Sequence, residues 1–440
     1  MSKVKSLLVV LTLVCAASIC QAESGPGNEE RVEKLEAALA AMQAELAALK
    51  AEQAKAAEVP VDPKQIDAMV GKAIDQKKAD FKLTPDWLNN VAVKGDFRYR
   101  HEWKDDESRT DDRNRHRIRA RLGIYGRANE EVDVGFRLAS GNNAAPTGDS
   151  EGSPASINQD LTNAFSSKNI WLDLAYFDYH PADIKGFKVL GGKIANPYFR
   201  VGKNDLMFDC DVNPEGVAAT YKTELSDSLD VFGTAGGYYV EERSTQGDTG
   251  LLAVQAGATH KFPDMEQAYV TAGGGYYDYG QIRGKAELGS VANQFYGNKN
   301  TGGADPRYDS DFDIAQAFAE AGFPINGLPF KVFGDYLKNT SAKSSEDTGF
   351  LLGASIGKCK KPGNWRFAYN YRELDADAVI GVLTEVTFGG GGSNVKGHTL
   401  CFGYQLAKNF QLAASYFSAE RTRTTTTDHD VVLMDLKAKF

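Results

Sequence analysis

The chain has little that could cross a membrane as a helix. A spanning helix takes about 20 consecutive apolar residues, and apart from Leu7–Ile19 none of the 440 residues lie in a comparable run. That run follows Lys3 and Lys5 and leads into Cys20-Gln21-Ala22, which ends in a small residue. This is the arrangement of a secretory signal peptide, so we predict one over residues 1–22. An exported chain without a spanning helix is either soluble or a barrel of strands.

Cysteine, proline and histidine are also scarce, with 5, 14 and 6 residues. Cys15 and Cys20 follow β-branched residues, which argues against lipidation. Cys210, Cys359 and Cys401 remain after cleavage, and their odd number in unrelated segments dictates no disulfide framework. The histidines lack metal-ligand spacing, and no Ser/His/Asp or Cys/His arrangement indicates catalysis. We therefore predict no metal, no cofactor and no enzyme. The net charge of −9 excludes a nucleic-acid partner.

What the chain does have is glycine (44), tyrosine (19), phenylalanine (23) and, from about residue 91, short segments whose apolar residues alternate with polar ones. Period-2 alternation indicates β-strands with two different faces. We predict sixteen strands, at 91–103, 115–126, 131–140, 169–179, 187–195, 216–223, 229–240, 250–261, 266–279, 313–323, 329–338, 348–358, 364–374, 397–406, 410–418 and 430–440.

Long and short connections alternate between these strands. Tight turns such as 128–130 and 407–409 separate long polar loops such as 141–168, 280–312 and 375–396, which we expect to face outside. A barrel that spans a bilayer has this rhythm, because its hairpins are short on one side and long on the other. We predict an all-β fold: a 16-stranded antiparallel transmembrane β-barrel over residues 91–440, preceded by a short N-terminal α-helical coiled coil.

The coiled coil is predicted over residues 23–57. Apolar residues there step by three and four, the a/d pattern of a heptad seam: Val32, Leu35, Leu39, Met42, Leu46 and Leu49. A single amphipathic helix on the barrel rim is the alternative. Residues 58–90 begin with the helix-breaking prolines Pro60 and Pro63 and form a predicted helical connector in the periplasm.

One face of the first two strands is strongly basic. Alternate positions align these side chains along a single wall: Lys94, Arg98, Arg100, Arg115, Arg117, Arg119 and Arg121. A packed core could not desolvate so many charges, so we expect this wall to line a watery lumen. It is either a basic strip that sets a transverse field in a pore or a ladder paired with carboxylates across the lumen, and the two are compatible.

With its signal peptide, heptad segment, sixteen-strand rhythm and final Phe440, the chain resembles a Gram-negative outer-membrane porin. The likeness is to the putative porins with an N-terminal coiled coil and, more distantly, to the phosphate-selective porins. Phe440 resembles the signal read by the barrel assembly machinery, although Ala438 stands where that signal usually has a second aromatic. The resemblance implies an outer-membrane location with the N-terminal segment in the periplasm, contact with lipid and lipopolysaccharide, and a homotrimer.

The family folds its third long loop into the lumen as a constriction. In this chain that loop is Asn196–Glu215, and its acidic residues would form the side opposite the arginines: Asp205, Asp209, Asp211 and Glu215. The alternative is an external loop whose acidic residues are simply solvated.

We therefore predict a passive diffusion channel for small hydrophilic solutes and ions through a charged constriction. One alternative is an anion-selective channel whose arginines bind phosphate or sulfate. A second is a structural tether that contacts peptidoglycan through the coiled coil. An outer-membrane phospholipase is disfavoured, because no nucleophile and base stand together.

Overall fold

The computed structural model describes residues 90–142, 152–243, 247–289 and 294–440, together with Ala40, Ala41, Gln43, Ala44, Ala47 and Ala48. The chain divides into two compact units, Met1–Thr84 and Pro85–Phe440. The predicted signal peptide, coiled coil and connector lie outside the described residues, except for Asn90 and those six N-terminal positions, which are helical. In the part of the chain that is described, no helix is both long and apolar enough to cross a membrane.

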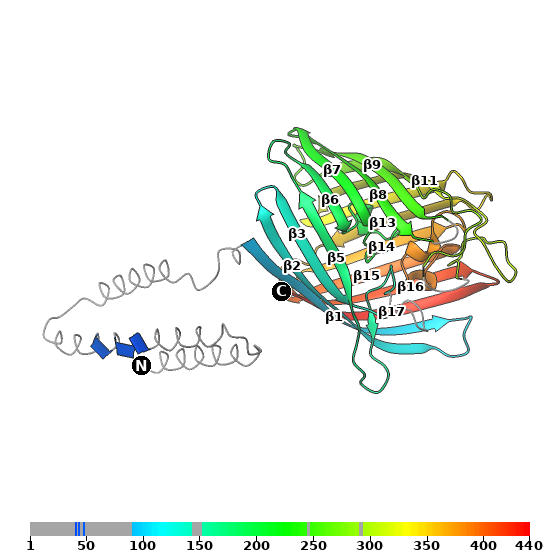
Figure 1. The fold of residues 1–440 in the computed structure, drawn as a ribbon, viewed down its shortest axis with the longest axis horizontal. Coiled ribbons are helices and arrows are strands. Elements are labelled where there is room, and N and C mark those ends of the chain that lie inside the picture. Colours follow the sequence, from blue (N-terminus) through cyan, green and yellow to red (C-terminus); the bar gives the residue numbers. More distant parts are fainter. Residues whose placement is uncertain are drawn as a thin grey trace. The chain divides into compact units, whose positions relative to one another are not determined.

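Sixteen long antiparallel strands form the second unit (Figure 1). They are β1 (Val91–Asp106), β2 (Arg113–Asn129), β3 (Val132–Ser140), β5 (Ile170–Tyr179), β6 (Phe187–Lys193), β7 (Glu215–Ser226), β8 (Leu229–Glu241), β9 (Thr249–Lys261), β10 (Tyr269–Asp278), β11 (Asp313–Ile325), β12 (Leu328–Asn339), β13 (Thr348–Gly357), β14 (Trp365–Leu374), β15 (Val395–Ala407), β16 (Phe410–Thr422) and β17 (Thr426–Lys439). The prediction of sixteen strands is confirmed, and each predicted boundary lies within four residues of the observed one.

A seventeenth strand, β4 (Gln159–Asp160), has only two residues and lies in the long connection between β3 and β5. It pairs with β2 where Arg117 is opposite Asp160. The alternating pattern could not reveal it, because two residues carry no period. Its effect is to bring a carboxylate from a loop against the inner face of β2.

The sheet closes into a barrel by pairing its first and last strands. The β1–β17 register runs from Asp96 opposite Lys439 to Asp106 opposite His429. Beyond it, Gly95 and Phe440 exchange two backbone hydrogen bonds of 3.0 Å. A Cβ atom at position 95 would lie 2.3 Å from the Phe440 ring, so glycine is required where the terminal ring crosses β1. Because the first and last strands pair with each other, neither is left as a free edge.

The two faces of the barrel differ in chemistry as the alternation predicts. On β14, Trp365, Phe367 and Tyr369 point outward and are 37–42% exposed, whereas Arg372, on the opposite face, is 3% exposed. Outward apolar side chains recur around the ring, for example Leu252 on β9 at 67% exposure. Such a continuous apolar exterior around a charged interior is the arrangement of a barrel in lipid.

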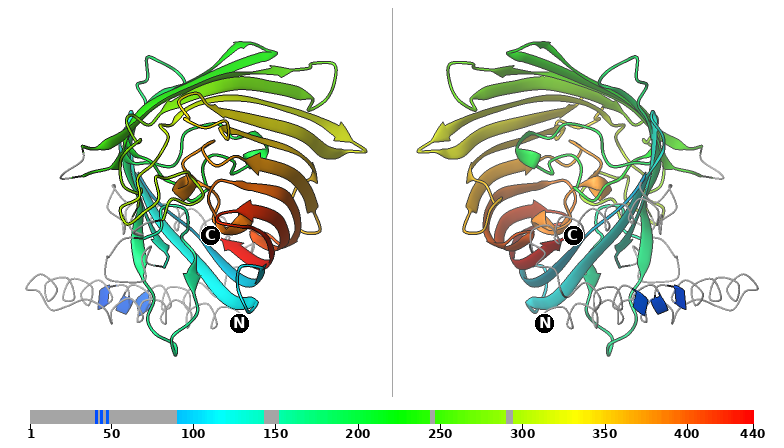
Figure 2. Two further views of the ribbon diagram at one scale, coloured as in Figure 1. Left: turned by 90° about the vertical axis from the view of Figure 1, so that its right-hand side faces the viewer. Right: turned by 90° about the vertical axis from the view of Figure 1, so that its left-hand side faces the viewer.

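Several long connections fold inward between the strands, as Figure 2 shows. They carry three short 3₁₀ helices: η2 (Val201–Lys203), η3 (Gly381–Leu383) and η4 (Phe388–Gly390). The loops near 280–312 and 375–396 pack inside the barrel, since Phe295, Ile380 and Phe388 are at most 4% exposed. They fold inward because their apolar residues are buried against other apolar residues inside the barrel. The side of the membrane on which the long loops lie stays a prediction.

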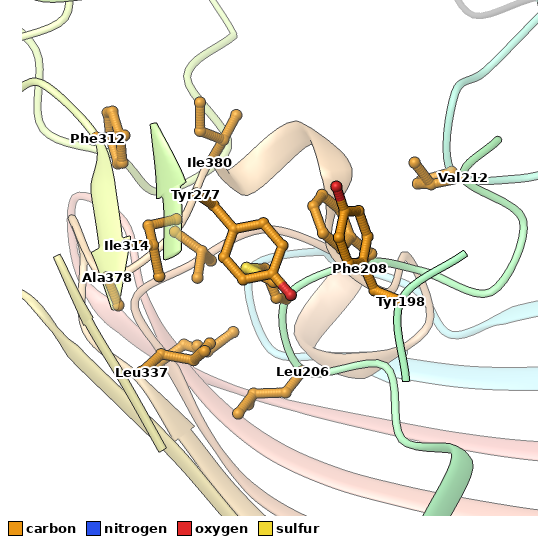
Figure 3. Close-up of a cluster of buried hydrophobic side chains, with 14 of the residues drawn as sticks. Tyr198, Leu206, Phe208, Val212, Tyr277, Phe312, Ile314, Leu337, Ala378 and Ile380 are labelled. Carbon is orange, nitrogen blue, oxygen red and sulfur yellow. The ribbon is translucent and has the colours of Figure 1, made fainter. Parts of the chain in front are cut away.

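That core lies inside the barrel. Tyr198, Leu206 and Phe208 of loop 194–214 pack with Tyr277 of β10 and Leu337 of β12 (Figure 3). Within the described residues, every strand from β7 to β17 contributes side chains to this cluster, and β1, β2 and β3 contribute none. The apolar packing thus stops short of the wall built by β1 and β2 and leaves that wall polar.

Candidate functional site

The predicted basic strip forms one inner wall of the barrel. We call Arg98 and Arg100 of β1, with Arg115, Arg117, Arg119 and Arg121 of β2, the arginine wall. Arg98 is opposite Arg119 in the strand register, and Arg100 is opposite Arg117. Like charges directly opposite each other destabilise a sheet, so this wall needs carboxylates between its guanidinium groups.

Four carboxylates provide that pairing. Asp96, on β1 itself, lies 3.0 Å from Arg119 and 2.7 Å from Arg121. Glu102, also on β1, lies 2.5 Å from Arg115 and 3.1 Å from Arg117. Asp160 of β4 pairs with Arg115 and Arg117, and Asp435 of β17 takes two hydrogen bonds from Arg100, of 2.6 and 2.8 Å. The ladder is thus paired, mostly by its own strands rather than across the lumen.

Positive charge still exceeds negative charge in this network. Seven basic side chains share the carboxylates of Glu102, Asp106, Asp160 and Asp435: Arg100, Lys104, Arg113, Arg115, Arg117, Arg421 and Lys437. Arg98, 8% exposed, donates instead to the amide oxygen of Asn158. The wall therefore combines the two interpretations of the basic strip: it is paired, and it remains basic.

Lys94 differs from the other basic residues. It is exposed near the short-turn end of β1, and its ammonium lies 5.6 Å from the centre of the Tyr125 ring on β2. This is a cation–π distance. Lys94 therefore stands at the rim of the wall rather than in its paired part.

Loop 194–214 crosses the interior, and the opposite strands hold it in place. The backbone N–H of Gly202 donates to Glu320 of β11 at 2.6 Å. The Asn204 side chain donates to Asp335 of β12 at 3.3 Å. A Cβ at position 202 would lie 2.5 Å from the Phe333 ring, and Gly202 has a φ of +59°, so this close approach requires glycine. The loop is an internal element with fixed contacts.

The four predicted acidic residues have different surroundings. Asp211 faces the arginine wall, 3.8 Å from Arg119. Asp209 accepts hydrogen bonds from the backbone N–H groups of Asp211 and Val386. Asp205 pairs with Arg200 of its own loop at 2.5 Å. Glu215 begins β7, pairs with Lys193 at 2.5 Å and shares the outward parity of Val217, so it is not part of the inner acidic edge.

Burial changes the ionisation of these loop groups. Burial, followed by the nearby Glu385 carboxylate, raises the pKa of Asp205 to about 7. Burial, together with Asp211 and Asp205, raises the pKa of Asp209 well above its usual range. At Asp160, burial also acts upward, but the guanidinium groups of Arg117 and Arg115 outweigh it, so its pKa lies below the usual range. The inner loop is thus less negative than its sequence suggests.

Loop 375–394 also packs inside the barrel, which the sequence did not predict. Arg372 of β14 pairs with Glu385 of this loop, and its guanidinium lies 3.8 Å from the centre of the Phe388 ring. The same side chain donates to the Asp205 carbonyl at 3.3 Å. Arg372 therefore binds both loop 194–214 and loop 375–394 to the barrel wall. Its inward parity on β14 was the available signal, but Asp205 is 167 residues away from it in the sequence.

A further contact joins the loops at their acidic edge. The N–H of Asp209 donates to the Leu383 carbonyl at 2.8 Å. Asp209, Cys210 and Asp211 bring three potential ligand atoms within 4.8 Å of one another, but the two carboxylates already face backbone N–H groups and Arg119. We assign no metal to this group. The thiols of Cys210, Cys359 and Cys401 are free.

A closed sixteen-stranded barrel with an apolar exterior, a charged interior and inward-folded loops defines a porin-type membrane channel. The chain belongs to the putative porin family, whose model matches residues 103–313 and 308–440. No curated protein matches the chain.

Two of the solved structures that match this chain have low sequence identity to it. OprB of Pseudomonas putida, at high pH, has 10% identity and a TM-score of 0.53, covering 81% of this chain and 96% of its own. OmpF of Salmonella typhi, solved in complex with daunomycin, has 14% identity and a TM-score of 0.48, covering 80% and 97%. As a member of the putative porin family, the chain is an outer-membrane diffusion channel.

Proposed function

We propose that small hydrophilic solutes and ions cross the barrel passively along the arginine wall, through a charged constriction between this wall and loop 194–214. Two features support this path. The apolar cluster takes side chains from β7 to β17 and none from β1 and β2, which disfavours hydrated solutes away from the wall. The ion pair of Asp211 with Arg119, at 3.8 Å, brings opposite charges together at the edge of the proposed passage, where the loop meets the wall.

The channel then prefers anions. The observation that carries this proposal is the excess of basic side chains on and beside the wall, where seven of them share four carboxylates. The opposite edge offsets this excess only weakly, because burial raises the pKa of Asp209 well above its usual range. Rings of charged side chains select ions of opposite sign in other pores.

The test is single-channel recording of the refolded protein in a planar bilayer, with the reversal potential read in a potassium chloride gradient. We expect stepwise openings and a reversal potential that favours chloride. Arg121→Gln should lower this preference. Lys343→Gln removes one exposed charge from loop 340–347, where Lys343 pairs with Asp309, and should leave the preference unchanged. Cation preference would contradict anion selectivity, and a folded barrel without conductance would contradict the channel.

The N-terminal segment has a separate proposed role. We propose that residues 23–57 form a coiled coil in the periplasm that joins three barrels into a homotrimer, supported by the a/d seam from Val32 to Leu49. The short turns would then face the periplasm and the long loops the lipopolysaccharide outside. A cell-wall tether acting through contact of this segment with peptidoglycan is the second candidate, favoured by the same seam.

A further proposal concerns the C-terminal residue, Phe440. Its ring covers Gly95, and its backbone closes the β1–β17 pairing, so the last residue stands where the barrel seals. We propose that the alternating residues that end in Phe440 are read by the barrel assembly machinery before closure.

A further inference from the structure

A small polar pocket lies between the arginine wall and the inner loops, towards the long-loop end of the barrel. Its volume is about 210 Å³. The charged and polar groups that matter here come from β1, β2, the segment before β4, and β17: Lys104, Arg115, Arg117, Ser156, Asn158 and His429. The volume is below the roughly 300 Å³ at which pockets for drug-sized ligands begin, so the pocket suits a small solute.

The pocket has more positive than negative charge. Lys104, Arg115 and Arg117 line it together with Glu102, the one carboxylate among its lining residues. Glu102 is already paired with both arginines, at 2.5 and 3.1 Å. Beyond the lining, Asp160 and Asp106 pair with the same basic groups. These two carboxylates also pair with Arg113 and Arg421, so the surrounding network is still basic. A partly dehydrated excess of cations is best neutralised by an anion within the pocket.

His429 is the observation that points to a bound group. It is 1% exposed, and both of its ring nitrogens are buried without a hydrogen-bond partner. Buried polar atoms in proteins are almost always paired, so an unpaired imidazole in a polar pocket calls for a ligand or a water. Its neighbours across the pocket add a hydroxyl at Ser156 and an amide at Asn158, which already hydrogen-bond to each other at 3.2 Å.

We propose that this pocket is a saturable binding site for a small oxyanion of the phosphate or sulfate type, held between Lys104, Arg115 and His429. The inference rests on the proposed function, because it needs a solute that enters the lumen, and it deepens it by naming a solute class and a place. An oxyanion presents acceptor oxygens on every side, which suits cationic, hydroxyl and imidazole donors converging from several strands. Loop 194–214 lies outside the pocket, so the site is distinct from the constriction.

The site predicts binding as well as conduction. Inorganic phosphate, sulfate and succinate are titrated separately into the folded full-length protein in detergent, and heat is measured by calorimetry. In parallel, each anion is added to a planar bilayer that carries chloride current through single channels. We expect phosphate or sulfate to bind saturably and to reduce the chloride current over the same concentration range. Succinate, a dicarboxylate, distinguishes a site for tetrahedral oxyanions from one that accepts any dianion. Succinate binding as tight as that of phosphate would overturn the assignment to phosphate-type or sulfate-type anions.

Two separate variants test the placement of the binding site, so the result does not depend on a single substitution. His429→Gln and Ser156→Ala should each weaken phosphate binding, the former by about tenfold, which is typical for a lost hydrogen bond to a charged group. His180→Gln is the matched control, since His180 lies in the turn between β5 and β6, beside Asp178. It should bind phosphate as the wild type does. Heat-modifiable gel mobility shows that each variant is folded.

The outcomes separate the two proposals. A conducting wild type with no saturable phosphate or sulfate binding overturns the pocket and leaves the channel intact. Saturable binding that neither folded variant weakens overturns the placement at His429. A folded protein that binds phosphate but never conducts overturns the proposed function while the pocket stands. Binding that weakens in both variants and is kept in the control supports the site.

Discussion

At the scale of single residues, the three carboxylates of the inner loop differ in what they add to the lumen. Asp211 faces Arg119, while Asp209 is turned towards backbone N–H groups. Asp205 pairs with Arg200. Burial, and after it the charge of Glu385, raises the pKa of Asp205 to about 7. Asp205 is therefore the group whose charge changes near neutral pH.

We predict that the anion preference falls as pH rises through about 7. The sign follows from the raised pKa: Asp205 is protonated and neutral below that value and negative above it, so raising the pH adds negative charge beside the passage. Reversal potentials measured in mildly acidic and mildly alkaline buffer check this. In Asp205→Asn the shift between the two buffers should shrink, and an equal shift in this variant would assign the titration to another group.

The sequence predicted the residues of the wall better than their partners. Period-2 parity placed Arg98, Arg117 and Arg119 on one inner face, and the same parity on β1 contains Asp96 and Glu102. Asp160 and Asp435 could not be predicted as partners, because one lies in a two-residue strand and the other 335 residues from Arg100. Strand closure and loop folding create these contacts, and neither leaves a local pattern.

At the scale of elements, a few hydrogen bonds and ion pairs hold the inner loops to the barrel and to each other. Glu320 of β11 accepts from Gly202 at 2.6 Å, from Tyr269 at 2.7 Å and from Lys331 at 2.5 Å. Arg372 joins loop 194–214 to loop 375–394. Loops 279–312 and 375–394 are joined in turn by Asn298, whose amide donates to the carbonyls of Ala376 and Val379 at 2.7 Å.

We predict that Arg372→Met loosens both inner loops. Removing the guanidinium leaves the Glu385 carboxylate without its partner, and breaking a buried pair costs about 3–5 kcal/mol. The expected result is a larger and noisier single-channel conductance from a barrel that still folds. Arg366→Met is the matched control, because Arg366 lies on the same face of β14, six residues nearer the short turns. Unchanged conductance in Arg372→Met would mean that the apolar cluster alone holds the loops.

The elements show where sequence-based prediction stops. Every long strand was predicted, because alternation is a local signal that each strand repeats. The inward path of loop 194–214 came from the family resemblance, not from its residues. The inward folding of loop 375–394 was missed, since its burial depends on Arg372 and on the apolar cluster, which form only when distant strands meet.

At the scale of the whole molecule, the barrel closes through pairing of its own strands. All sixteen long strands lie within residues 91–439, and β1 needs only β2 and β17 for its pairing. The described hydrogen bonds that close the ring end at Gly95 and Phe440. Among the described residues, this closure uses residues of the second compact unit.

We therefore predict that deleting residues 23–80, with the signal peptide kept, preserves the conductance and ion preference of each channel. The deletion removes the proposed coiled coil, and three heptads contribute to association only while the barrels hold the helices together. Trimers on semi-native gels should dissociate at a lower temperature than those of the full chain, while monomers keep their heat-modifiable shift. A tether would give the opposite pattern, with trimers unchanged and the outer membrane detaching from the cell wall. Loss of conductance in a folded deletion variant would contradict the separation of pore and N-terminal segment.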